Sequence, residues 1–235
     1  NYSLAATTAQ SAGTITRRTL TVDTVAAQTK TYDGTRAADA SQFRAALAGA
    51  IAGDSVAAGA TGAAYNDKNV AAANRIDYTG VALAGADAGN YSLAATTAQG
   101  AGTITKRTLT VGTVAAQSKT YDGSVSADAG KFSATLGNTI AGDSVTATAA
   151  DAAYNSKDVA AANAVNYTGV ALGGSDAGNY TLAATTAQGT GTITKRALTL
   201  GAVESQSKTY DGTTAADTSK FRAALVNTVE GDNVT

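Results

Sequence analysis

Apolar and polar residues alternate with a period of two along several short segments. In residues 108–111 Leu and Val alternate with Thr, and in residues 91–93 Tyr and Leu flank Ser. Side chains on one face of a β-strand recur with this period. Residues 159–172 predict one or two further strands, with a bulge or kink at Tyr167-Thr168-Gly169, where the apolar phase shifts by one. The pattern predicts an all-β fold built from short, half-buried strands.

Turn-forming residues separate these segments every dozen or so residues. Asp122-Gly123 predicts a tight hairpin turn, because such turns need positive backbone angles. Gly142-Asp143 and residues 155–158 and 173–178 predict further turns.

One stretch, residues 41–51, fits two structures. Phe43, Leu47 and Ile51 are four residues apart, which suits a helix face, and all are at odd positions, which suits a strand face. We favour a strand. Phe43, Tyr78 and Tyr91 lie in alternating patterns that predict burial.

The sequence contains an internal repeat with a period of 89 residues. Tyr32-Asp33-Gly34 recurs as Tyr121-Asp122-Gly123 and Tyr210-Asp211-Gly212, and 121 − 32 and 210 − 121 both equal 89. A unit of this length suits a small autonomous domain better than a short solenoid repeat. We therefore expect a tandem array of small β-sandwich, Ig-like domains. The alternative is a β-grasp-like α+β unit with one short helix.

The repeat boundaries are expected next to basic pairs such as Lys106-Arg107. This places the end of one repeat at residues 1–16, complete repeats at 17–105 and 106–194, and the first half of another at 195–235. The chain is therefore expected to be a segment of a longer array. No Gly-, Pro- or Ser-rich spacer separates the repeats, so we expect little bending between them.

Composition removes several function classes. The 235 residues include no Cys, His, Met, Trp or Pro, so thiol and imidazole catalysis and Cys/His zinc sites are excluded. A net charge of −1 favours neither nucleic acid nor an anionic membrane as a partner. No run approaches the roughly 20 apolar residues of a membrane helix. We expect no enzyme activity, no membrane insertion of this segment and an extracellular location, where a lack of Cys avoids mispaired thiols.

The Tyr-Asp-Gly triplets are the sharpest motif. We interpret them as structural, with a packed Tyr ring whose hydroxyl bonds beside an Asp-Gly turn. No cofactor is expected. Calcium would have to be shared between loops, because no single acidic turn supplies six oxygen ligands. An isopeptide crosslink needs a buried acid beside Lys and Asn; Lys119, Asp122 and Asn179 are the candidates, although a Lys before a turn is usually exposed.

The succession of motifs resembles the YDG-type repeats of bacterial filamentous haemagglutinin-like and autotransporter adhesins. The resemblance covers the whole chain and rests on residues 119–123, 142–145, 154–159, 169–172, 176–180 and 192–195. It implies large proteins exported to the bacterial surface, and it implies no catalytic residues. The expected function is a stalk or spacer whose partners are neighbouring repeats, with host glycans or proteins bound by other regions. The alternative is a module that binds host glycan or protein at each repeat, gaining avidity from the array.

Overall fold

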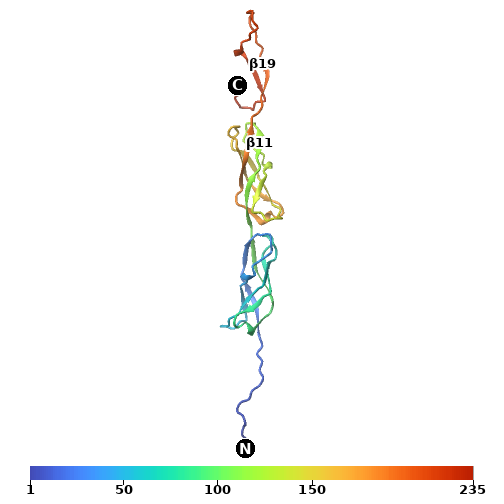
Figure 1. Cartoon of the computed structure of the whole chain (residues 1–235), viewed down its shortest axis with the longest axis vertical. Coiled ribbons are helices and arrows are strands. Elements are labelled where there is room, and N and C mark those ends of the chain that lie inside the picture. The colour runs from blue at the N-terminus through green and yellow to red at the C-terminus, as the bar shows by residue number, and fades with distance from the viewer. Residues whose placement is uncertain (235) are drawn as a thin grey trace. The chain divides into compact units, whose positions relative to one another are not determined.

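The computed structural model describes residues 1–234 and is nearly all β-structure, as expected (Figure 1). It divides into two compact units. The first comprises Asn1–Arg107 with Gly178–Tyr180, and the second comprises Thr108–Ala177 with Thr181–Thr235. Residues 1–17 form no helix or strand and are exposed. Within the described residues, no helix is long and apolar enough to cross a membrane.

Nine strands and two 3-10 turns follow these first residues. They form three sheets, with the strand orders β3-β1-β8, β2-β9-β6-β5 and β4-β7. The elements are β1 (Arg18–Val25), β2 (Gln28–Thr31), η1 (Ala40–Gln42), β3 (Ala45–Ala48), β4 (Ala57–Gly59), β5 (Gly62–Tyr65), β6 (Arg75–Thr79), β7 (Ala82–Ala84), η2 (Ala88–Asn90), β8 (Tyr91–Leu93) and β9 (Thr97–Thr105).

The same order of elements returns 89 residues later. The sheets are β12-β10-β17, β11-β18-β15-β14 and β13-β16, followed by the pair β19-β20. The elements are β10 (Arg107–Val114), β11 (Gln117–Thr120), η3 (Ala129–Lys131), β12 (Ala134–Gly137), β13 (Thr146–Thr148), β14 (Asp151–Tyr154), β15 (Ala164–Thr168), β16 (Ala171–Gly173), η4 (Ala177–Asn179), β17 (Tyr180–Leu182), β18 (Thr186–Thr194), β19 (Thr199–Val203), η5 (Thr218–Lys220) and β20 (Ala223–Val226).

Parallel and antiparallel pairings are combined in each repeat. Strand β9 pairs antiparallel with β6 and parallel with β2, where Lys30 lies opposite Ile104. Its burial alternates along the strand, with Gly100, Gly102 and Ile104 facing inward. The expected period-two pattern is therefore present in the central strand, and the parallel pairing joins β2 to the sheet that β9 forms with β6 and β5.

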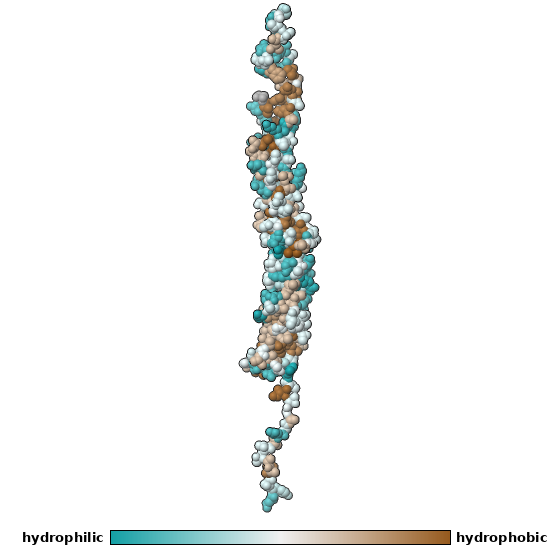
Figure 2. All heavy atoms as spheres, in the orientation of Figure 1, coloured by the Kyte–Doolittle hydropathy of each residue, from teal (hydrophilic) through white to brown (hydrophobic). Residues whose placement is uncertain are grey.

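Tyrosine side chains fill much of the core. Tyr65, Tyr78, Tyr154 and Tyr167 are each at most 4% exposed, and the predicted burial of Phe43 and Tyr91 is confirmed. Aromatic side chains bury large areas, which offsets the scarcity of large aliphatic residues in this chain. By contrast, apolar side chains of the C-terminal part are exposed, as the brown surface in Figure 2 shows. They include Leu198, Leu200, Val203, Phe221 and Val226.

Residues 41–51 begin as a 3-10 turn and continue as a strand. The carboxylate of Asp39 accepts the Ser41 N–H and caps η1, and β3 then covers Ala45–Ala48. The preferred strand is confirmed for those four residues. The helix is limited to one 3-10 turn.

The predicted hairpin at Asp122-Gly123 is wrong. Gly123 has the positive φ expected of it, +80°, but Asp122 does not. A two-residue I′ hairpin needs both. The strand before this turn, β11, pairs in parallel with β18 instead of with the strand that follows it.

The expected kink after Tyr167 marks a change of sheet. Strand β15 pairs with β14 and β18, whereas β16 pairs with β13. Gly169, with a φ of +63°, lies between β15 and β16. The predicted strand run starts later than expected, because residues 159–163 are turn and loop and β15 begins at Ala164.

Candidate functional site

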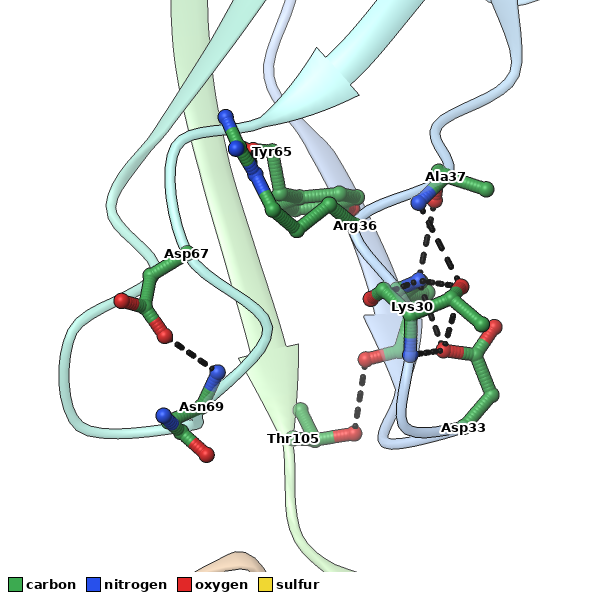
Figure 3. Close-up of polar contacts among 9 residues, drawn as sticks. Lys30, Asp33, Arg36, Ala37, Tyr65, Asp67, Asn69 and Thr105 are labelled. Carbon is green, nitrogen blue, oxygen red and sulfur yellow. Dashed lines mark hydrogen bonds and ion pairs between the residues drawn. The ribbon is translucent and has the colours of Figure 1, made fainter.

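The Asp-Gly turn of the YDG motif is held by a lysine from the preceding strand (Figure 3). Lys30, on β2, donates from Nζ to the Asp33 carboxylate at 2.8 Å and to the carbonyl oxygens of Thr35 and Ala37 at 2.9 Å. The same ammonium lies 5.2 Å from the centre of the Tyr65 ring, within range of a cation–π interaction. One cation therefore ties together the turn, the chain after it and a core tyrosine.

The second copy of the motif repeats this network, and the third copy repeats its Lys–Asp bond. Lys119 donates to Asp122 at 2.8 Å and to the Ser126 carbonyl at 3.0 Å, and it lies 5.3 Å from the Tyr154 ring centre. Lys208 donates to Asp211 at 2.9 Å. The expectation of an exposed lysine is wrong for Lys119, whose side chain is 18% exposed. An ammonium has three donors, and these carbonyls and the carboxylate satisfy them.

The aspartate also orders the turn after it. Asp122 Oδ1 accepts the N–H and the hydroxyl of Ser124, and Asp33 does the same with Thr35. The bond from Lys119, together with those from Ser124, lowers the pKa of Asp122 from 3.8 to about 2. A carboxylate that accepts several hydrogen bonds is stabilised in its charged form. The arrangement is an ionised Lys–Asp pair with a structural role.

This pair predicts a loss of stability in acid. Because the folded pKa of Asp122 is below its unfolded value, its contribution is present above about pH 4 and is lost as the pH falls from 4 through about 2. The carboxylate is 47% exposed, so solvent screening keeps the contribution to about 1 kcal/mol or less. Urea unfolding should show Asp122→Asn to be less stable than the wild type at pH 5, with the difference shrinking as the pH falls towards 2. Asp23→Asn, at an exposed position on β1, is the control, and a difference at pH 2 as large as that at pH 5 would contradict the assignment.

The three motif tyrosines lie in different surroundings. Tyr32 is fully buried, Tyr121 is partly buried, and Tyr210 is 93% exposed. The hydroxyl of Tyr121 donates to Asp232 at 3.0 Å, so its partner is not the adjacent Asp-Gly turn that the sequence suggested. Gly34, Gly123 and Gly212 all have φ between +77° and +80°, as a left-handed turn position requires.

The candidates for an isopeptide bond are only partly brought together. Lys119 contacts Asp122, but the amide of Asn179 is engaged with Asn69 and with the Val70 N–H. The acid is ionised and about half exposed, whereas attack of the Lys amine on the Asn amide, with loss of ammonia, needs a buried acid beside both groups. These contacts favour an ion pair.

The carboxylate oxygens of the acidic turns accept hydrogen bonds from backbone N–H groups. Asp87 accepts the Ser55 N–H at 2.7 Å, and Asp176 accepts the Ser144 N–H at 2.9 Å. Among residues 1–234, no group of three or more Asp or Glu side chains is placed to hold a metal ion. Calcium has no ready ligand set in this part of the chain.

The fold and the lysine-held turn define a tandem β-repeat protein. The YDG domain family matches residues 16–98 and 105–187, which is more than half of the chain, so the protein belongs to this family. The two matches start 89 residues apart, as 105 − 16 shows. No curated protein and no solved structure matches the chain.

Proposed function

We propose that this chain is a spacer segment of a large bacterial adhesin, exported to the cell surface, that holds a distal binding region away from the cell. It catalyses no reaction. Its partners are the neighbouring repeats, and other regions of the adhesin bind host glycans or proteins. We further propose that each repeat is an Ig-like sandwich, because its sheets bury a shared aromatic core.

The link between the two complete repeats carries this proposal. Strand β9 ends at Thr105 and β10 begins at Arg107, so Lys106 alone separates them. A flexible connection would need a run of Gly or Ser residues. A chain that passes from strand to strand through one residue has little freedom to bend, which is the property that a spacer needs.

The burial of aromatic side chains favours a spacer over an adhesive repeat. A binding patch repeated along the array would present aromatic side chains at the same exposed place on each repeat. In the complete repeats, the pairs Phe43/Phe132, Tyr65/Tyr154 and Tyr78/Tyr167 are each at most 9% exposed. These aromatic residues serve the core in both copies.

Small-angle X-ray scattering of the full chain tests the proposal. We expect a scattering profile of a stiff, extended particle. Insertion of Gly-Ser-Gly-Ser after Lys106 is the matched control and should shorten the maximum dimension by introducing a hinge. A compact globule, or a wild-type profile as flexible as that of the insertion variant, would overturn the spacer. Saturable binding of the wild-type chain on a glycan array would favour the adhesive alternative.

A further inference from the structure

We propose that the YDG tyrosine packs against the following 89-residue repeat and so restricts motion between the two repeats. We call this set of contacts the joint. This inference deepens the proposed spacer function, since a joint of this kind would set the stiffness of an array. It rests on contacts inside each compact unit, because each unit contains residues from two successive repeats.

The first contact is made by Tyr121 in the second unit. This tyrosine belongs to the repeat 106–194, and its hydroxyl donates at 3.0 Å to Asp232, which belongs to the next repeat. A hydrogen bond to a carboxylate is stronger than one between neutral groups. Asp232 is the acid of the Gly-Asp motif, so two motifs of the sequence repeat meet here.

The glycine of the same triplet allows close approach. A Cβ on Gly123 would lie 2.8 Å from Val229 Cγ1, which also belongs to the next repeat. A Cβ on Gly212, at the equivalent position of the last motif, would have no atom within 4 Å. Both residues have positive φ, +80° and +78°, so the turn alone needs glycine in each. At Gly123 a Cβ would in addition require the Val229 side chain to shift.

The first unit shows a corresponding joint around Tyr32. This tyrosine is fully buried, and its ring packs edge-on against Tyr180, with centroids 5.3 Å apart and planes at 77°. Beside it, Asn179 accepts the Val70 N–H at 2.9 Å and donates to Asn69 at 3.0 Å. Tyr32, Asn69 and Val70 belong to one repeat, and the Asn-Tyr pair belongs to the next.

Two equivalent residues show that this environment comes from the neighbouring repeat. Asn179 is 5% exposed, whereas Asn90, 89 residues earlier in an identical Asn-Tyr motif, is exposed. The local motif is the same in both, so the difference in burial follows from what is packed against Asn179.

The equivalent surface of the second complete repeat forms part of a cavity. Tyr121, Asp158 and Val159 stand 89 residues after Tyr32, Asn69 and Val70, and they line a cavity of about 290 Å³ together with Val229 and Asp232. The surface that receives the Asn-Tyr pair in the first unit is thus a recess in the second. Its fitting occupant is the Asn-Tyr segment of a following repeat.

Distance measurements between spin labels test the joint. The chain has no Cys, so Thr190→Cys and Glu204→Cys give two unique label sites, one in each repeat of the second unit. Double electron–electron resonance should give a narrow distance distribution for the labelled parent. Tyr121→Phe removes the hydroxyl alone, and we expect it to broaden the distribution at least twofold. Tyr210→Phe is the matched control and should leave it unchanged.

Further variants keep the test decisive. Asp232→Asn should broaden the distribution as Tyr121→Phe does, and the double variant should add little to either. Asn179→Ala should lower the urea midpoint of the first unit, whereas Asn90→Ala should not. If Tyr121→Phe, Asp232→Asn and Gly123→Ala all leave the distribution as narrow as that of the parent, the joint is overturned.

The joint and the spacer function can fail separately. If the variants broaden the distance distribution but the wild-type scattering profile is compact, the joint stands and the spacer falls. If the wild-type particle is stiff but none of the variants changes the distribution, another contact provides the stiffness.

Discussion

Tyr167→Ala is expected to destabilise the second complete repeat by about 3–5 kcal/mol, which is the usual cost of removing a large aromatic side chain from a core. Tyr167 is 1% exposed in β15, and its ring packs edge-on against Phe132 at 4.8 Å. Its hydroxyl also accepts a hydrogen bond from Gln117 Nε2 at 2.6 Å. The substitution therefore opens a cavity and leaves a buried amide with one partner fewer.

Part of the expected loss of stability comes from a hydrogen bond between Gln117 and the Tyr167 hydroxyl. The Gln117 side chain is 8% exposed, and its Nε2 donates to Tyr167 and to the Asp128 carbonyl. Tyr167→Phe keeps the ring but removes the acceptor, so we expect a smaller loss of about 1–3 kcal/mol. Comparison of the two variants separates the cavity from the hydrogen bond.

The measurement must report on one repeat, because the other contains the same pair. Hydrogen exchange read by mass spectrometry over residues 106–194 gives the opening free energy of the altered repeat. Tyr2→Ala, at a fully exposed site, is the control. A loss below about 1 kcal/mol for Tyr167→Ala would show that this ring is not part of the stabilising core.

Local patterns were sufficient to predict strands, buried aromatic residues and turn glycines. Leu109 and Tyr91 are buried at positions that alternation indicates, and Gly123 and Gly142 have positive φ. These properties depend on a few neighbouring residues, and each residue type favours one backbone geometry. The family assignment also follows from the motifs, because their spacing is constant.

Strand pairing could not be predicted in the same way. Strand β11 pairs in parallel with β18, and Gln117 lies opposite Gly191, 74 residues later. Nothing near Asp122-Gly123 carries information about so distant a partner. The turn sequence alone suggested the local alternative, a hairpin.

The fully and partly buried polar side chains were missed for a different reason. Lysine and glutamine are usually exposed, so Lys119 and Gln117 had no signal of burial in the sequence. Their partners are carbonyl groups and tyrosines that the fold brings to them. The sole available signal was the recurrence of both residues at positions 30 and 28 of the preceding repeat.

Gly174→Ala is expected to destabilise the second unit by about 3 kcal/mol or more. Gly174 has a φ of +101°, a conformation that costs an L-residue about 1–2 kcal/mol. In addition, a Cβ would lie 2.3 Å from the Ser144 carbonyl oxygen and 2.9 Å from its carbon. The contact is with backbone, so it is relieved by moving the loop, and overpacking of this kind adds about 1–3 kcal/mol.

Movement of this loop would also break bonds that hold it. Asp176 donates its N–H to the Ser144 carbonyl at 3.2 Å, and its carboxylate accepts the Ser144 N–H at 2.9 Å. Gly142→Ala is the matched control, because Gly142 has a φ of +92° with no atom within 4 Å of the Cβ position. It should cost about 1–2 kcal/mol through backbone strain alone. Urea unfolding of both variants measures the difference, and equal losses would mean that the loop adjusts without cost and that backbone strain accounts for the whole effect.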